Sequence, residues 1–557
     1  MKKLVYIAFL FSIYLTTNYT HAQDEKIIIS SLKKELARFL QKLSTEQYPP
    51  YYLSYIVFDI ETATVSNSFG RTATKNNSRN RILNIDLRVG NYILDNTHKV
   101  DIDAFSFSSF QNTKLPLKGD EKALRTSIWN ATEKTYKDAM KQYQSVLSSR
   151  ALKVKEEDTS ADFTQEIPPT IYFEPRETYT IDLDRWERIF NRVSTIFRQN
   201  KWLLDGKISF SFENQYKIFV DSEGAEISQN QPKFRINIFV RAKAEDGMVL
   251  YLSRNFFGFK EDELPTEDSI KSALVELIDK LQRLTKAPLM ETYSGPAILK
   301  GEASGVFFHE ILGHRAEGHR QKDPRSAQTF KSFLNKQVLP EFIDVVFDPT
   351  ISELNGTKLS GFYKYDDEGV KAQKVVCIEN GIFKNFIMSR SPIENFPKSN
   401  GHGRKNYGYR AVARQSNLIV ESTKKVPFSK LREMLIDESK RQGKEYGLLF
   451  EKVEGGFTFT SRTMPNAFNV LPIVVYKVYV DGRPDELVRG VDLIGTPLTT
   501  FSNIATTADD LEVFNGICGA ESGPVPVSAA SPSILVSKIE VQKKEKSEEK
   551  PPVLPSP

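Results

Sequence analysis

Two histidines and a glutamate at a fixed spacing constrain this chain more than any other feature of its sequence. Residues 305–314 read Gly-Val-Phe-Phe-His-Glu-Ile-Leu-Gly-His, so His309, Glu310 and His314 form an HExxxH pattern. The chain has six histidines among 557 residues, which makes such a pair rare by chance. Zinc binds imidazole nitrogen and thiolate sulfur, and hydrolytic zinc sites use three protein ligands with a fourth position open for water. If Cys518 supplies the thiolate, the fold must bring distant parts of the chain together.

The spacing of the two histidines predicts a distortion of the helix that carries them. Residues five apart on an ideal α-helix lie about 140° apart around the axis and about 7.5 Å along it. A π-bulge would bring the imidazoles of His309 and His314 together, and Gly313 lowers the cost of leaving ideal geometry. We therefore expect a π-bulge between Glu310 and His314. Two buried histidines that are merely hydrogen-bonded are the alternative.

The other histidines carry weaker signals. His319 lies beside Arg320 and is expected near the metal or at the surface, with direct metal binding as the alternative. His402, in Asn-Gly-His-Gly-Arg, belongs to a basic loop that could contact substrate or form a simple turn. His98 has no acidic or cysteine neighbours in a ligand pattern, so we assign it no role.

The first 22 residues are typical of a secretory signal peptide. Lys2 and Lys3 precede an apolar run from Leu4 to Leu15, and Thr20-His21-Ala22 offers a cleavage site. A retained single anchor is the alternative. No later stretch approaches the roughly 20 apolar residues that a spanning helix needs. We therefore expect an exported protein, periplasmic or secreted, that is cleaved near Ala22 and has no integral membrane segment in its mature form.

Charge and cysteine content argue against a nucleic-acid-binding protein and against a protein held together by a disulfide framework. The chain has 76 lysines and arginines against 71 aspartates and glutamates, a balance that offers no electrostatic footprint for nucleic acid. Two cysteines are too few for a disulfide framework in an exported chain of this length. A single bridge between Cys377 and Cys518 stays open as an alternative.

Length and patterning predict an α+β protein of two domains. The chain exceeds what one hydrophobic core usually organises, and Pro288, followed by the loop through residues 294–296, marks a boundary near residue 290. We expect an N-terminal α+β domain over residues 23–290 and a β-rich C-terminal domain over residues 291–542. The second domain carries the metal helix near its start. Residues 543–557 are charged and then proline-rich, which predicts a disordered tail.

Periodicity places the main elements. Helical spacing of apolar residues predicts helices over residues 27–43, 121–147 and 270–284. Alternation predicts strands over residues 51–65 and 82–93 and a meander over residues 217–254. A short strand at residues 297–300 is expected to precede the metal helix, which begins at Gly301. Asn380-Gly381 is the strongest hairpin signal, because a type I′ turn needs positive φ at both central residues.

Several further motifs, in order, resemble the TldD/PmbA family of metallopeptidases. The resemblance covers most of residues 290–541 and is with the TldD-type subunit, which carries HExxxH, rather than with the PmbA (TldE) type, which lacks it. Over residues 24–290 it extends only to general layout. The motifs beyond HExxxH are Glu317-Gly318, Asp366-Asp367-Glu368-Gly369, Ile378-Glu379-Asn380-Gly381, Gly455-Gly456-Phe457, Gly495-Thr496-Pro497-Leu498-Thr499, Ile517-Cys518-Gly519, Val525-Pro526-Val527 and Ser531-Pro532-Ser533.

The resemblance implies a site and an assembly. It implies Zn2+ bound by His309, His314 and Cys518, with Glu310 as the catalytic base. It also implies a two-domain subunit that dimerises around an enclosed chamber, either with itself or with a PmbA-like relative, and cleaves unfolded or extended peptides held like an added β-strand. Cys377, in the apolar run from Val375 to Ile378, is then the inert thiol.

Taken together, the sequence predicts an exported zinc-dependent metallopeptidase in which Glu310 deprotonates a zinc-bound water. One alternative is a metal-stabilised binding or scaffold subunit that lacks catalysis, and another is a redox protein with Cys377 and Cys518 as its pair. The export signal, the helix at residues 121–147 and the charged tail depart from the compact cytoplasmic members of the family, which leaves substrate and partner open.

Overall fold

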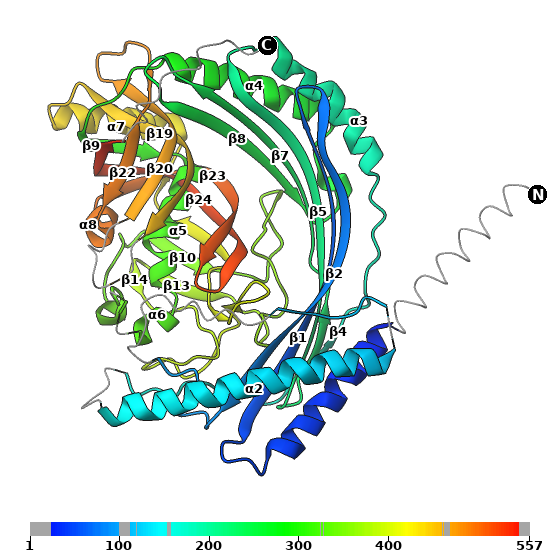
Figure 1. Cartoon of the computed structure of the whole chain (residues 1–557). Coiled ribbons are helices and arrows are strands. Elements are labelled where there is room, and N and C mark those ends of the chain that lie inside the picture. The colour runs from blue at the N-terminus through cyan, green and yellow to red at the C-terminus, as the bar shows by residue number, and fades with distance from the viewer. Residues whose placement is uncertain are drawn as a thin grey trace, which may run out of the picture.

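The computed structural model describes residues 24–99, 112–118, 120–152, 158–323, 325–326, 328–458, 461 and 468–544. It is a mixed α+β fold built on two large sheets, as expected. The N-terminal sheet arches along one side of the molecule, and the C-terminal sheet lies within the arch (Figure 1). The expected signal peptide and residues 545–557 of the expected tail lie outside the described residues. Within the described ranges, no helix is long and apolar enough to cross a membrane.

Eight strands form the N-terminal sheet, in the order β3-β2-β1-β5-β6-β4, with β7 between β5 and β8. The expected meander is present, and its turns lie at Gly224 and Gly247, with φ of 101° and 89°. The strands are β1 (Pro50–Ser68), β2 (Arg71–Val89), β3 (Thr113–Lys114), β4 (Ile171–Phe173), β5 (Leu203–Asp221), β6 (Glu226–Gln229), β7 (Pro232–Lys243) and β8 (Val249–Gly258).

The two faces of the arched sheet differ in chemistry because side chains alternate along each strand. On the outer face, Ile208, Phe210 and Phe212 of β5 belong to an apolar cluster with residues of α3 (Leu183–Val193) and α4 (Glu267–Lys286). On the inner face, the intervening Ser209, Ser211, Glu213 and Gln215 are half-buried. The concave face is therefore polar along this part of β5, whereas Phe219 further along the strand belongs to an apolar cluster that packs against the C-terminal half. Both parts look toward the C-terminal sheet (Figure 1).

Two further helices cover the lower half of the arch. A helix at residues 24–43 and α2 (Glu121–Leu152) pack against β1, β2 and β5 through a second apolar cluster. Both helices were expected, and α2 runs five residues beyond its expected end. One short 3₁₀ helix, η1 (Ser194–Gln199), follows α3, and another, η2 (Glu261–Glu263), precedes α4.

The C-terminal sheet is organised around its last strand. β24 (Gly523–Lys543) pairs along different parts of its length with β9, β17, β22 and β23. The other strands of this sheet are β9 (Tyr293–Leu299), β10 (Ile343–Phe347), β13 (Val375–Glu379), β14 (Ile382–Phe383), β17 (Asn417–Ser422), β18 (Lys425–Val426), β19 (Tyr446–Thr458), β20 (Phe468–Tyr479), β21 (Glu486–Val488), β22 (Val491–Gly495) and β23 (Ile504–Ala520). Two separate two-stranded sheets are formed by β11 (Glu353–Leu354) with β12 (Thr357–Lys358) and by β15 (Gly403–Arg404) with β16 (Val412–Ala413).

The turn between β13 and β14 is the one expected at Asn380-Gly381, with φ of 49° and 73° at the two residues. The helical segments of this half are α5 (Gly301–Ile311), η3 (Gly313–Arg315), α6 (His319–Lys322), η4 (Lys331–Phe333), α7 (Phe428–Arg441) and α8 (Pro497–Ser502).

Helix α5 lies directly on the backbone of β24. A Cβ atom at Gly305 would lie 2.7 Å from the carbonyl oxygen of Ala529, and one at Gly301 would lie 2.7 Å from that of Ser531. Real Cβ atoms do not approach so closely, so both positions need glycine. The hydroxyls of Ser304 and Ser531 are hydrogen-bonded at 2.7 Å. This contact fixes the helix that carries the HExxxH pattern against the strand that pairs with β23.

Candidate metal centre

The segment from Glu310 to His314 is distorted, but not by the expected π-bulge. The α-helix ends at Ile311, and a 3₁₀ turn follows, in which the Arg315 N–H donates to the Leu312 carbonyl at 2.9 Å. The reason is crowding: a Cβ atom at Gly313 would lie 1.9 Å from Oε1 of Gln415. A glycine lets the chain tighten here, since no side chain needs room.

Arg315 satisfies the backbone of the helix end. Its Nη1 donates to the carbonyl oxygens of Glu310 and Ile311, at 3.0 and 3.1 Å. The last carbonyls of an α-helix have no partner within the helix, so a buried helix end needs such donors. Burial lowers the pKa of Arg315 to about 10. Arg315 therefore holds the turn between the two histidines in place.

The distorted turn brings the three candidate ligands together. One ligand atom from each of His309, His314 and Cys518 lies within 4.8 Å of the other two. Cys518 Sγ is 3.4 Å from His314 Nε2, and the two imidazole rings are 5.1 Å apart between centroids. A tetrahedral zinc ion with bonds of about 2.0–2.3 Å holds its ligand atoms roughly 3.5 Å apart. The donor set and its spacing therefore fit zinc after small side-chain movements.

The ligands also influence one another electrostatically. Burial acts to raise the pKa of the Cys518 thiol, but His314 and His309 outweigh it and hold that pKa well below its ordinary value. Burial acts to lower the pKa of His314, but Cys518 and Glu317 raise it well above its ordinary value. Cys518 is thus held as a thiolate, which is the form that binds metals.

Glu310 reaches the same spot with one oxygen unpaired. Its Oε2 atom is buried, has no hydrogen-bond partner among the described residues, and lies 4.0 Å from His314 Nε2. β19 passes close behind the side chain: a Cβ atom at Gly456 would lie 2.6 Å from Glu310 Cγ. A buried carboxylate oxygen without a donor is costly. It therefore marks a position where a water, a substrate or a cation is expected.

Sequence reasoning missed the groups that surround the ligands. Glu317 Oε2 lies 3.3 Å from His314 Nδ1 and accepts a hydrogen bond from Arg320 at 2.8 Å. Burial acts to raise the pKa of Glu317, but Arg320 and His314 lower it to about 2, so it is an anion. Arg414 donates to the carbonyl of Cys518 at 2.7 Å. The only sequence signal was an acidic residue three positions after the second histidine, on the same side of a helical turn.

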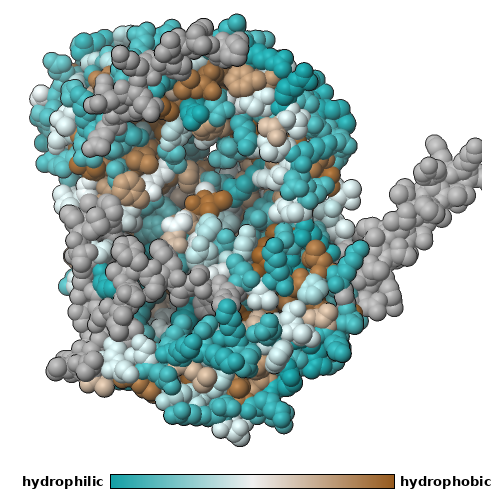
Figure 2. All heavy atoms as spheres, in the orientation of Figure 1, coloured by the Kyte–Doolittle hydropathy of each residue, from teal (hydrophilic) through white to brown (hydrophobic). Residues whose placement is uncertain are grey.

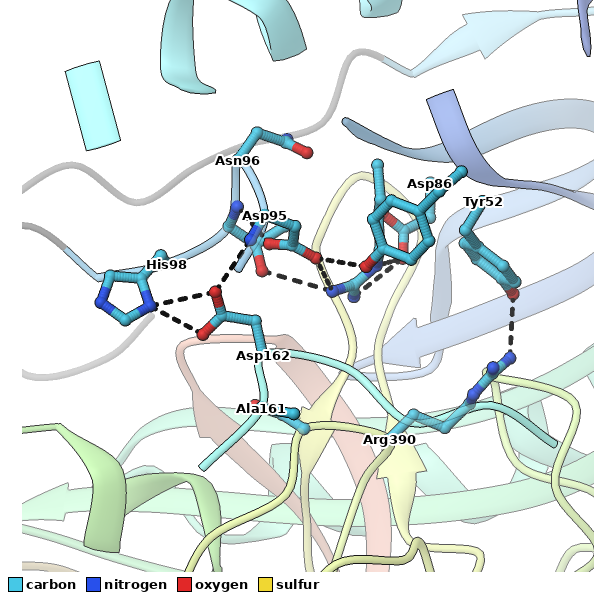
Figure 3. Close-up of polar contacts among 12 residues, drawn as sticks. Tyr52, Asp86, Asp95, Asn96, His98, Ala161, Asp162 and Arg390 are labelled. Atoms are coloured by element: carbon cyan, nitrogen blue, oxygen red, sulfur yellow. Dashed lines mark hydrogen bonds and ion pairs between the residues drawn. The ribbon is translucent and has the colours of Figure 1, made fainter. Parts of the chain in front are cut away.

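The other histidines lie outside the ligand set. His319 is buried and hydrogen-bonded to Glu521, which agrees with a place near the metal rather than on it. His402 does not reach a substrate surface: it is fully buried and bonded to Ser416 Oγ at 3.1 Å, and burial lowers its pKa to about 3. His98 has a structural role, with Nδ1 2.8 Å from a carboxylate oxygen of Asp162 (Figure 3).

The cysteines do not pair. Both are free and buried, Cys377 in β13 and Cys518 beside the histidines. Burial raises the pKa of Cys377 well above its ordinary range, so this thiol is inert. The alternative of a Cys377–Cys518 bridge is therefore wrong for this structure.

Comparison with known proteins finds metalloprotease relatives. Residues 292–543 match the sequence model of the PmbA/TldA metallopeptidase C-terminal domain. A metalloprotease of Methanocaldococcus jannaschii is 28% identical over 323 residues, which is 58% of this chain and 66% of the relative. A zinc metalloprotease TldD homolog of Saccharolobus solfataricus is 25% identical over 60% of this chain and 70% of the relative. Together these matches show that this chain is similar to metalloproteases of the TldD/PmbA family, most clearly over residues 292–543. The chain covers about two thirds of the length of such relatives.

Solved structures share the TldD/PmbA fold. TldE from Thermococcus kodakarensis superposes with a TM-score of 0.56 at 13% identity, covering 92% of this chain and all of that one. A structure from Thermotoga maritima gives a TM-score of 0.58 at 14% identity, covering 91% of this chain and 99% of that one. At these identities the likeness shows the fold, including its two-sheet arrangement.

Proposed function

We propose that this protein is an exported zinc peptidase of the HExxxH-bearing TldD type. The observation that carries the proposal is the meeting of His309, His314 and Cys518 within 4.8 Å, with an unpaired carboxylate oxygen of Glu310 beside them. Two imidazoles, one thiolate and an adjacent carboxylate form the donor set of a catalytic rather than a closed structural zinc site.

Each residue has a role that follows from its position. His309, His314 and Cys518 would hold Zn2+, which when bound supplies a Lewis acid and a source of hydroxide near neutral pH. Glu310 Oε2 takes a proton from the attacking water and returns it to the leaving amine. Glu317 keeps the His314 ring oriented, since its carboxylate lies at the nitrogen away from the other ligands.

An extended peptide is the substrate that suits the surroundings. β23 pairs with β24 along one edge, whereas residues 511–520 have no strand on the other edge among the described residues. Cys518 lies in this stretch, and the neighbouring Ile517 is 62% exposed. A free strand edge can bind a peptide backbone without demanding a sequence. The proposed substrate is therefore an unfolded or extended chain lying along β23.

Assembly and location complete the proposal. The fold likeness to TldE supports a dimer, either of two copies or with a PmbA-like relative. The apolar run behind Lys2 and Lys3 supports export to the periplasm or the exterior.

Metal analysis of the mature protein, paired with peptide cleavage, tests the proposal. We expect one zinc per chain and cleavage by the native protein. Cys518→Ser should weaken zinc binding by more than about 100-fold, because loss of a ligand exceeds the 10–100-fold effect of losing an outer partner. Cys377→Ser is the matched control and should keep its zinc. Zinc retained without any cleavage would favour the scaffold alternative, and unchanged zinc in Cys518→Ser would refute the ligand set.

A further inference from the structure

A cavity of about 490 Å3 lies between the two sheets, beside the metal centre. One wall comes from the concave face of the N-terminal sheet, through β5, β7 and the segment after β8. The other wall comes from residues 360–367, 404–406 and 524–526 of the C-terminal half. The space-filling view shows the molecule hollowed between the arch and the C-terminal sheet (Figure 2). A cavity of this size is in the range of ligand-binding sites.

The lining of the cavity carries an excess of positive charge. Six of its side chains are cationic and four are acidic. Two of the acidic side chains form ion pairs with cations of the same lining, Asp367 with Lys217 at 2.6 Å and Glu174 with Lys364. A third, Asp366, accepts three backbone N–H bonds, and burial together with Glu368 raises its pKa well above the ordinary value, which favours the neutral acid. The six cationic residues are Lys217, Lys233, Lys260, Lys364, Arg404 and Lys405.

Arg404 is the best placed of these cations. It is buried, its guanidinium lies 4.8 Å from the centroid of the Tyr363 ring, and its Nη1 donates to the Gln415 carbonyl. Burial lowers the pKa of Arg404, because its neighbours only partly compensate for the removal of the charged guanidinium from water. A planar guanidinium is suited to bind a carboxylate through two parallel hydrogen bonds.

Lys233 adds a second charge from the opposite wall. It lies 3.3 Å from Glu213, and its side chain is 13% exposed. Burial lowers the pKa of Lys233, so an incoming anion would stabilise its charged form too. Each wall of the cavity therefore contributes a largely buried cation to its lining.

The cavity lies one strand spacing from the metal centre. Val525 lines it and is the ladder partner of Cys518 in the β23–β24 pair. Both residues belong to one small apolar cluster. Directly opposed residues on paired strands have Cβ atoms about 4.5–5.5 Å apart. A group bound in the cavity would thus belong to a substrate whose backbone passes the metal ligands.

Building on the peptidase function proposed above, we propose that this cavity binds a carboxylate of the peptide substrate, with Arg404 and Lys233 as specificity-determining residues. The carboxylate is an acidic side chain close to the scissile bond or the free C-terminus of the peptide. Either source offers two oxygens to the guanidinium and a counter-charge to the lysine. The protein then selects peptides by charge at one position while binding their backbone without regard to sequence.

Equilibrium binding of matched peptides to the mature Glu310→Gln protein tests this proposal without relying on turnover. One pair differs by Glu against Gln at an internal position, and the other by a free against an amidated C-terminus. We expect the carboxylate member of one pair to bind at least about tenfold more tightly, as a charge-assisted hydrogen bond would give. The pair that shows the preference identifies the source of the carboxylate.

Variants of the cavity complete the experiment. Arg404→Gln and Lys233→Gln should each reduce the preference to less than about threefold, while Lys207→Gln, an exposed lysine on β5, should leave it intact. Lys233 lies on β7 of the N-terminal sheet, whereas the candidate zinc ligands belong to the C-terminal half, so its variant guards against an indirect effect of Arg404→Gln on the metal. No preference in the Glu310→Gln protein, or the same preference in both variants, would overturn the proposal. Absence of cleavage by the native protein would instead count against the peptidase function alone.

Discussion

The metal centre and the polar network between the two halves of the molecule are both buried, but they differ in what surrounds their unsatisfied polar atoms. In the network, Arg390 donates to Tyr52 (Figure 3) and also to Thr164 and Glu223, and both oxygens of Asp95 accept hydrogen bonds. At the metal centre, Glu310 Oε2 has no donor among the described residues. Within the described part of the chain, the network keeps two buried atoms without a hydrogen-bond partner, Asp86 Oδ1 and Thr164 Oγ1, but they lie among ion pairs and hydrogen bonds that join the two halves, and such a network rigidifies a fold. An unsatisfied carboxylate next to three candidate ligands points to chemistry instead.

Glu310→Gln should separate the two regions most strongly. We expect peptide cleavage to fall by about 10²–10⁴-fold, the range for loss of a general base. Thermal stability should not fall, because a neutral amide is cheaper to bury than an unpaired carboxylate. Cleavage assays and thermal unfolding of the same preparation measure both effects. Glu302→Gln, on the same helix, is the control and should keep activity; a large drop in thermal stability for Glu310→Gln would instead make Glu310 structural.

Arg390→Met should show the opposite pattern. Removing the guanidinium leaves Glu223 buried without its partner, and breaking a buried ion pair costs about 3–5 kcal/mol. Urea unfolding should report this loss, while the zinc content of the folded protein should not change. Arg483→Met removes an exposed arginine paired with Asp481 and should cost less than about 1 kcal/mol. Equal effects of the two arginine variants would refute a structural role for the network.

Glu317→Gln tests the boundary between the two regions, since Glu317 is an anion that pairs with Arg320 and contacts a metal ligand. Its loss should weaken zinc affinity by about 10–100-fold, because the amide orients and polarises the His314 ring less well. Competition with a chromogenic chelator measures the affinity directly. Glu521→Gln, which alters the partner of His319 instead, should have a smaller effect. The assignment fails if the two variants lose zinc equally.

The smallest effect is expected from pH. Burial raises the pKa of Glu368, which accepts a hydrogen bond from the Arg390 N–H, from 4.5 to about 7. The native state then binds more protons than the unfolded state between these two values, so stability falls as pH rises through this window. Urea unfolding at pH 5 and pH 7.5 should differ less in Glu368→Gln, by on the order of 1–3 kcal/mol. An unchanged difference would mean that Glu368 titrates normally.

The sequence was most informative where local patterning decides structure. Periodicity placed the helices at residues 24–43, α2 and α4, and positive-φ residues placed the hairpin at Asn380-Gly381. These features depend on near neighbours in the chain, so they can be read without knowing the fold. The domain limits near residue 290 and residue 542 stay predictions.

Long-range contacts could not be predicted in the same way. The spacing of His309 and His314 implied a distortion, but the kind of distortion was wrong, because the contact of Gly313 with Gln415 joins segments far apart in sequence. Arg414 was missed for the same reason, since it follows β16 and contacts Cys518 across more than 100 residues of sequence. Glu317 is close to His314 in sequence, but its contact with the imidazole depends on the 3₁₀ turn. The metal assignment itself stays a prediction until an ion is bound.

The contact of α5 with β24 has a consequence for how the site tolerates change. Gly301 and Gly305 lie against peptide groups, so the gap between helix and strand is set by backbone thickness rather than by side-chain packing. His309 lies on the helix and His314 on the 3₁₀ turn that follows it, while Cys518 lies on the strand that pairs with β24. Drift in the surrounding hydrophobic core can therefore alter overall stability while the distance across the metal centre stays constant. Replacing either glycine even by alanine would place a methyl group where there is no room for it. The spacing between helix and strand therefore cannot change in small steps through substitutions at these two positions.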